Sequence, residues 1–274
     1  MNWFEKFIYA LSGEMPTPSN YGWFHLMFIA IFIGLSVAIV FVTKKHKSEK
    51  SFKIIVWTSW AIMFLLEIYK QLVFSLSVAD GVATWKYHWY SFPYQLCSTP
   101  LYVLPIIGCL KESKFRDALM SFISTFAFFG GLVVFIYPGN VFVETIGINL
   151  QTMIHHGLQI FIGVYFICYN KQKIDFKYFL KAIYVFLVSL SLAMILNLLA
   201  PTFTNQTFNM FYISPYFPSV LPLLDVIYAN VPYICYLLIY IFGFVLAAFI
   251  VQVVTMLCTG KFKKKEQTNE KSQN

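Results

Sequence analysis

The sequence predicts an all-α membrane protein: a bundle of seven transmembrane helices with its N-terminus outside and its C-terminus in the cytoplasm. Three observations predict this fold: an apolar composition, seven long apolar segments, and lysines that gather on alternate loops. Apolar residues make up 59% of the 274 positions and charged residues 12%, whereas a soluble domain carries about 25% charged residues. A chain with so few polar side chains cannot cover itself towards water, so its solvent is lipid.

The segments have the length that a bilayer requires. A hydrocarbon core of ~30 Å is crossed by about 20 apolar residues of helix. Backbone groups in lipid must be paired internally, and a helix pairs them within one segment. The seven predicted spans cover residues 21–42, 54–76, 92–110, 118–137, 150–169, 179–199 and 232–257.

The basic residues set the orientation, because cytoplasmic loops are rich in lysine and arginine. Four connections or tails would lie inside, and they carry Lys44, Lys45, Lys47, Lys50 and Lys53; Lys111, Lys114 and Arg116; Lys171, Lys173, Lys177 and Lys181; and Lys261, Lys263, Lys264, Lys265 and Lys271. The opposite side has only Lys6 and Lys86. The net charge of +8 therefore reflects topology and attraction to anionic lipid head groups, and nucleic acid is not implied.

The regions outside the helices divide the chain into three parts. Residues 1–20 form an extracytoplasmic segment, in which Trp3, Phe4, Phe7, Ile8 and Leu11 recur at the spacing of a short interfacial helix. Residues 21–257 form the seven-helix domain, whose longest outer loop, residues 200–231, is apolar enough to dip into the membrane or fold over the bundle. Residues 258–274 form a basic cytoplasmic tail. The preference for lysine over arginine indicates an AT-rich genome, and so the cell membrane of a bacterium.

Polar side chains inside the spans are informative, because they are costly in lipid unless they face the bundle interior and find partners. They include His25, Glu67, Lys70, Gln95, Cys97, His155, His156 and Asn197. At 1.5 Å per helical residue, Cys97 and His156 would lie roughly 8 and 9 Å below the outer boundary. This common depth predicts one pocket that opens outwards.

Each of these residues also has a purely structural interpretation. A lone transmembrane cysteine is usually a small packing residue, and Glu67 and Lys70 could simply neutralise each other. His155 and His156 are adjacent and point about 100° apart on a helix. At most one of them can face a given site, so the other would bond to a neighbouring helix.

The functional interpretation is a cysteine–histidine pair. A thiol becomes a nucleophile as its thiolate, and burial in lipid opposes that charge. A nearby histidine can accept the proton and stabilise the ion pair. Glu67 or Asn197 could then orient the imidazole, as the third member of a catalytic triad does.

At these residues the sequence resembles the YwaF-like family of bacterial membrane proteins, whose eukaryotic relatives are the transmembrane-protein-164 lipid acyltransferases. The resemblance extends over nearly the whole chain and is carried by His25, Glu67, the segment Phe92–Cys97, His156-Gly157, Asn209–Pro215 and Pro232-Tyr233. It favours His156 over His155 as the site histidine. One position departs from the family pattern, because Ser98 stands where an aspartate usually follows the cysteine.

The resemblance implies a Cys/His-dependent transfer of acyl chains between phospholipids. Our leading hypothesis is therefore an enzyme that moves a fatty acyl chain through a thioester on Cys97, on a phospholipid or glycolipid in the outer half of the bilayer. We predict that Cys97, His156 and Glu67 are catalytic. The predicted substrate-binding residues are His25, Gln95, Lys70, Asn197 and Asn209. We expect no metal and no organic cofactor, because the cysteines and histidines lack metal-ligand spacing.

Two alternatives use the same residues differently. In a transporter or solute-capture protein, Glu67 and Lys70 would bind the ligand or a coupling ion and Cys97 would be passive, although the chain lacks the internal repeats that many transporters have. In a thiol redox protein, Cys97 would pair with Cys235 if their helices touched.

Overall fold

The computed structural model describes residues 3–79, 82–139 and 141–261, and most of them are helical. Six helical segments in this part of the chain are long and apolar enough to cross a membrane. They are α2 (Trp23–Lys45), α3 (Glu49–Ser75), the continuous run of α5 (Lys114–Phe122), the π-helical turn η3 (Ile123–Ala127) and α6 (Phe128–Ile136), then α7 (Ile146–Tyr169), α8 (Phe176–Leu199) and α10 (Tyr233–Cys258).

The third predicted span, residues 92–110, differs from the prediction. Its helical part is the short turn η2 (Leu96–Ser98) followed by α4 (Pro100–Cys109), and ten residues of helix measure about 15 Å, half of the ~30 Å core. Two prolines explain the difference, because each lacks an amide donor and disfavours helix in the residue before it. Pro93 precedes the turn, and Pro100 occupies the first position of α4. Seven full helical spans are therefore not confirmed.

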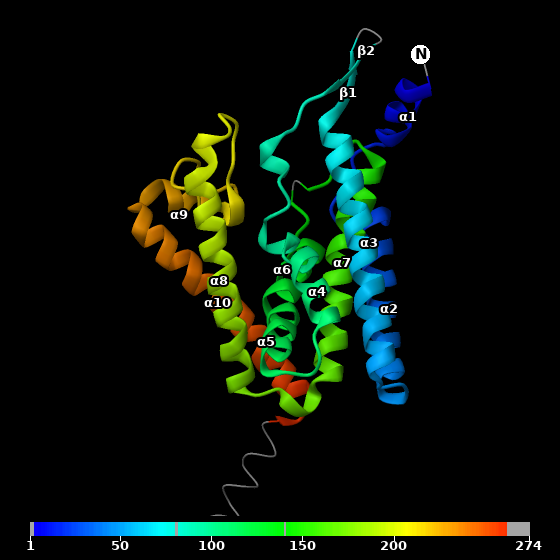
Figure 1. Cartoon of the computed structure of the whole chain (residues 1–274), viewed down its shortest axis with the longest axis vertical. Coiled ribbons are helices and arrows are strands. Elements are labelled where there is room, and N and C mark those ends of the chain that lie inside the picture. Colours follow the sequence, from blue (N-terminus) through cyan, green and yellow to red (C-terminus); the bar gives the residue numbers. More distant parts are fainter. Residues whose placement is uncertain (1–2, 80–81, 140, 262–274) are drawn as a thin grey trace, which may run out of the picture.

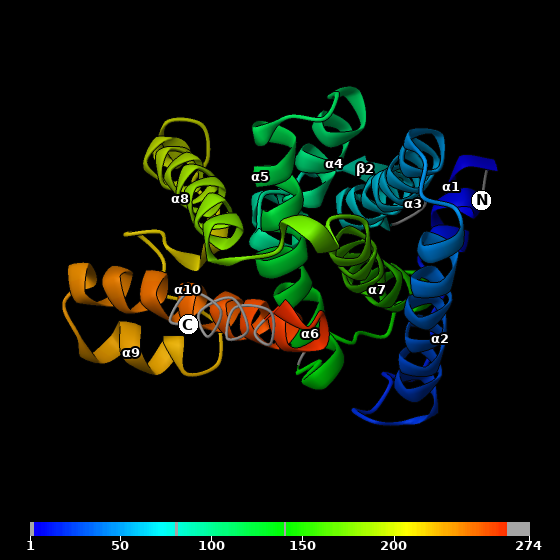
Figure 2. The ribbon, with the colours of Figure 1, turned by 90° about the horizontal axis from the view of Figure 1, so that it is seen from below.

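The helices form three groups (Figures 1 and 2). On one side α7 packs against both α2 and α3. In the centre, the α5–η3–α6 run contacts α4, α7, α8 and α10. On the other side stand α8 and α10, together with the short helix α9 (Leu224–Asn230). The central run is thus the element that joins the two flanks.

Lysine-bearing segments gather at one end of the bundle. The connections from α2 to α3, from α4 to α5 and from α7 to α8 lie at that end, together with the end of α10 (Figure 1). The opposite end carries α1 (Trp3–Leu11) and an antiparallel hairpin of β1 (Leu76–Ala79) and β2 (Val82–Trp85), in which Leu76 faces Trp85. This arrangement agrees with the alternation of the basic loops. Residues 262–274, most of the predicted basic tail, lie outside the described residues.

A buried arginine organises the lysine-rich end. Arg116 in α5 is 2% exposed, and its guanidinium donates to both carboxylate oxygens of Glu49 at the start of α3, at 2.5 and 3.3 Å. Its guanidinium carbon also lies 4.6 Å from the centre of the Phe52 ring. Because the guanidinium pairs with Glu49 and lies over the Phe52 ring, and both of these residues belong to α3, Arg116 ties α3 to α5.

Two segments before and between the long helices largely follow the sequence. The predicted helix within residues 1–20 is present as α1, and Trp3 and Phe7 stay exposed on it, as an interfacial helix requires. The apolar loop 200–231 folds against the bundle, where Phe208 and Phe211 are buried. That loop is fastened by Asn197, which donates to the Met210 carbonyl at 2.9 Å and accepts from the Met210 amide at 2.7 Å.

Candidate functional site

Cys97 lies in the η2 turn, just before the N-terminus of α4. Its backbone carbonyl accepts two hydrogen bonds from α7, one from His155 Nε2 at 2.9 Å and one from Gln159 Nε2 at 2.6 Å. These bonds fix the backbone of the cysteine against the face of α7. The expectation that His156 alone faces the site is therefore wrong, because the His155 ring bonds the backbone of Cys97.

The two histidines bond in opposite ways, and this fixes their neutral tautomers. A carbonyl can only accept, so His155 carries its proton on Nε2 and leaves Nδ1 with a lone pair. His156 bonds the Thr152 carbonyl through Nδ1 at 2.7 Å, so its Nε2 carries the lone pair. The ring centres lie 5.6 Å apart. Each histidine therefore has one nitrogen able to accept a proton.

Glu67 and Lys70 form an ion pair on α3, with Nζ and Oε1 2.8 Å apart. Gln71 donates to the same carboxylate oxygen at 2.7 Å and also to the Ser91 carbonyl at 2.7 Å. The Glu67 carboxylate is thus anchored through one oxygen. The sequence left open whether Glu67 and Lys70 neutralise each other. In the structure they form an ion pair through Oε1, and Glu67 Oε2 has no partner within the protein.

Buried polar atoms without a protein partner gather in this region. Among the described residues, four such atoms belong to side chains next to Cys97 or bonded to it: Glu67 Oε2, Gln95 Oε1, His155 Nδ1 and Gln159 Oε1. Buried polar atoms in folded proteins are nearly always paired with protein or water. Their concentration around one cysteine indicates a place built to receive polar atoms from outside the chain.

Two charged side chains act on the region around Cys97. The ammonium group of Lys70 interacts electrostatically with Cys97, His155 and His156. The Glu67 carboxylate interacts with Cys97 as well. The predicted residues Cys97, His156, Glu67 and Lys70 thus belong to one neighbourhood, to which α3, η2 and α7 contribute.

Sequence reasoning missed two of the site residues. Gln159 lies four residues after His155, so the two side chains share one face of α7. This spacing could have identified Gln159 from the sequence. Tyr212, in the loop 200–231, interacts electrostatically with Cys97. It lies far away in sequence, and no local pattern points to it.

Tyr212 is held in an unusual backbone conformation. Phe211 and Tyr212 both have positive φ angles, 56° and 58°. This left-handed backbone conformation costs free energy for residues with bulky side chains and is easily adopted only by glycine. Two tyrosines of α10 hold this segment: Tyr236 donates to the Tyr212 carbonyl and Tyr233 to the Ile213 carbonyl, each at 2.6 Å. The strained residues are thus in the part of the loop 200–231 that approaches Cys97.

Three predicted substrate-binding residues have their polar atoms engaged within the protein. His25 accepts from the Tyr21 amide at 3.0 Å and bonds the Phe135 carbonyl at 3.1 Å, which joins α2 to α6. Asn197 is occupied by Met210, as described above. Asn209 bonds the Phe217 and Pro218 carbonyls and accepts from Ser214. These residues shape the bundle and the loop 200–231. Gln95 differs, because it donates to the Asn209 carbonyl at 2.8 Å and its Oε1 has no partner within the protein.

Close helix contacts surround the histidines. A Cβ atom at Gly157 would collide with the Phe32 ring of α2, and one at Gly131 of α6 would lie 2.6 Å from the His156 carbonyl. Glycine after His156 therefore lets α2 pack directly on α7. The π-helical turn η3 contacts both η2 and α7, and such turns occur frequently at functional sites.

The site lies deeper than the sequence indicated. Because α7 begins at Ile146, four residues before the predicted start, His156 is ten residues or about 15 Å along it. Glu67 is eight residues, about 12 Å, from the end of α3 at Ser75. The polar residues therefore lie near the middle of the bundle.

The five cysteines are free thiols, and Cys235 is exposed. The pairing of Cys97 with Cys235 that the redox alternative requires is thus not present. Within the described part of the chain, no three His, Cys, Asp or Glu side chains are grouped so that they could hold a metal ion.

Comparison with known proteins gives one match. The model of the TMEM164 family matches residues 18–259, nearly the whole chain. No curated protein and no solved structure matches.

Proposed function

The chain belongs to the TMEM164 family, and from this membership and the geometry around Cys97 we propose that it is a membrane enzyme that transfers fatty acyl chains between lipids. Helices long and apolar enough to span a membrane surround the candidate site, which supports membrane lipids as its substrates. The narrower YwaF-like bacterial relationship remains part of the proposal, as does its location in a bacterial cell membrane.

The observation that carries the proposal is the set of unpaired buried atoms around Cys97. Glu67 Oε2, Gln95 Oε1, His155 Nδ1 and Gln159 Oε1 all lack a protein partner. A passive packing cysteine would not need such surroundings, because unpaired buried atoms destabilise a fold. All four atoms accept hydrogen bonds, so hydroxyl groups of the acceptor lipid and of lipid head groups would supply the missing donors.

In the first half-reaction Cys97 acts as the nucleophile and His156 as the base. His156 Nε2 takes the thiol proton, and the positive charge of Lys70 stabilises the thiolate. The sulfur attacks the ester carbonyl, so a C–S bond forms and the C–O ester bond breaks. The departing lipid alkoxide takes the proton back from His156, which leaves an acyl thioester on Cys97.

In the second half-reaction the same groups act in reverse. His156 removes the proton from the hydroxyl of an acceptor lipid, whose oxygen attacks the thioester. The C–S bond breaks, and the thiolate recovers the proton from His156. His155 is a positioning residue in this scheme, because its bond to the Cys97 carbonyl holds the nucleophile. Glu67 orients Lys70, and the free oxygen of Gln95 accepts a bond from the substrate.

A second candidate function is supported by the ion pair of Glu67 and Lys70. Ionisable groups inside a membrane protein commonly mark substrate or ion pathways. In a transporter these two groups would bind the solute, and Cys97 would be dispensable. The importance of Cys97 therefore separates the two functions.

The test of the proposed function is untargeted lipid analysis of cells that express the wild type, Cys97→Ala or an empty vector. We expect the wild type to redistribute acyl chains among phospholipids or glycolipids, and Cys97→Ala to match the empty vector. If Cys97→Ala reproduces the wild-type lipid profile, acyl transfer through Cys97 is excluded and the transporter becomes the better interpretation.

The orientation is a further part of the proposal, with seven passages of the chain through the membrane. Single cysteines introduced at Lys86 and Asp225 should react with an impermeant thiol reagent in intact cells. Those at Lys47 and Lys173 should react only after the membrane is opened, because basic loops stay in the cytoplasm. Labelling of Lys47 and Lys86 positions from the same side would contradict this topology.

A further inference from the structure

A long groove runs along the bundle, away from Cys97. Its apolar part is a cavity of about 590 Å³ between α2, α6 and α7. A second cavity of about 760 Å³ continues towards the lysine-rich end, where α10 joins its wall. Val40, Leu132 and Val164 line both cavities, so the two adjoin, and together they are called the groove. Each volume lies in the usual range of ligand pockets.

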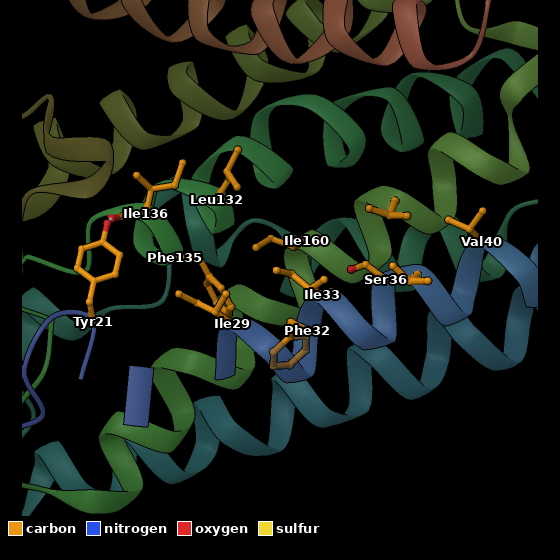
Figure 3. A pocket seen from close by; sticks show the side chains of 12 residues that line it. Tyr21, Ile29, Phe32, Ile33, Ser36, Val40, Leu132, Phe135, Ile136 and Ile160 are labelled. Atoms are coloured by element: carbon orange, nitrogen blue, oxygen red, sulfur yellow. The ribbon is translucent and has the colours of Figure 1, made fainter. Parts of the chain in front are cut away.

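The smaller cavity, between α2, α6 and α7, is almost wholly apolar. Figure 3 shows Ile29 and Ile33 of α2 facing Leu132 and Ile136 of α6, with Ile160 of α7 between them. The hydroxyl of Ser36 points into the cavity and has no protein partner. Such walls favour a hydrocarbon chain.

The groove is closed at the end opposite the lysines. The Tyr21 hydroxyl donates to the Ile136 carbonyl, and His25 bonds the neighbouring Phe135 carbonyl at 3.1 Å. These contacts join the beginning of α2 to the end of α6. An occupant of the groove therefore extends towards the lysine-rich end.

The lysine-rich end of the groove is lined by three cationic side chains, Lys44, Lys47 and Lys171. Within the described part of the chain, none of the three forms an ion pair. The carboxylates Glu49 and Asp117 of the same end are engaged by Arg116 and Lys173. The groove thus combines an unneutralised positive rim with an apolar interior.

We propose that this lysine-rimmed groove binds an anionic glycerophospholipid of the cytoplasmic leaflet. Its phosphate lies among Lys44, Lys47 and Lys171, and one acyl chain extends between α2, α6 and α7. The charge complementarity is specific to the rim, because Lys45 and Lys50 carry the same charge at the same end of the bundle but do not line the cavity. The inference does not depend on acyl transfer at Cys97.

The test is native mass spectrometry of the purified full-length protein with equal amounts of dioleoyl phosphatidylglycerol and dioleoyl phosphatidylcholine. We expect the wild type to retain phosphatidylglycerol preferentially. The triple substitution Lys44→Gln, Lys47→Gln, Lys171→Gln should weaken this binding tenfold to roughly a hundredfold, since each basic residue near a head group contributes to the attraction. The matched control, Lys45→Gln with Lys50→Gln, should retain the lipid.

A second variant tests the apolar part without changing the charge. Val40→Trp fills the junction of the two cavities. If the acyl chain occupies the groove, this variant should also weaken phosphatidylglycerol binding. If only the phosphate were bound, the variant would bind like the wild type. Cys97→Ala should bind like the wild type, which separates this site from the proposed reaction. Equal retention of phosphatidylcholine, equal loss in the lysine control, or full binding by Val40→Trp would each overturn the proposal. If the triple variant does not fold, the single substitution Lys47→Gln replaces it, and it should cause a smaller loss of phosphatidylglycerol binding.

Discussion

Cys97→Ser is expected to reduce acyl transfer to about 1% of the wild-type rate or less. A hydroxyl is far harder to deprotonate than a thiol, and one neutral histidine in a buried site is too weak a base for it. The Lys70 ammonium stabilises a thiolate near it but cannot make up that difference, because Glu67 already neutralises part of its charge. The measurement is the rate of acyl exchange between defined lipids in vesicles that contain the purified protein.

Cys109→Ser is the matched control, because Cys109 is the last residue of α4, the helix that follows the Cys97 turn, and is exposed. It should transfer acyl chains at the wild-type rate. An acyl-chain activity probe should label the wild type covalently at Cys97 and nowhere else. Undiminished transfer in Cys97→Ser, or labelling that persists in Cys97→Ala, would show that the reaction does not pass through this thiol.

The membrane architecture was predictable because its cause is local. Apolar length and the placement of lysines depend on neighbouring residues, and six of the predicted spans are long membrane-type helices in the structure. The third span was overestimated for an identifiable reason. Its apolar composition is that of a full helix, but Pro93 and Pro100 interrupt the backbone hydrogen bonds on which such a helix depends.

The candidate site was only partly predictable. The sequence marked Glu67, Lys70 and Cys97 as polar groups in apolar segments, and the structure brings them together. It could not show which ring of His155-His156 contacts Cys97, because that depends on the rotation of α7 against η2. It also could not show that the Asn197 amide is fully hydrogen-bonded to the Met210 backbone, because the path of the loop 200–231 is a tertiary property.

The adjacent histidines have different expected roles, and substitution should separate them. His156→Ala is expected to lower the rate of acyl transfer by a factor of about 10² to 10⁴, the usual contribution of a general base. Adding Cys97→Ser to it should cause little further loss, because members of one catalytic unit are not additive. The acyl-exchange measurement on purified variants gives both values.

His155→Ala should lower the rate less, because it removes one of the two bonds to the Cys97 carbonyl and leaves that of Gln159. His155→Gln should restore most of the activity, because a glutamine amide reaches a position similar to Nε2 and can donate to the same carbonyl. Glutamine cannot accept and return a proton, so His156→Gln should remain as inactive as His156→Ala. If instead His155→Gln is as inactive as His155→Ala, while His156→Ala keeps its activity, then the free Nδ1 of His155 is the base, and the assignment of the two histidines must be exchanged.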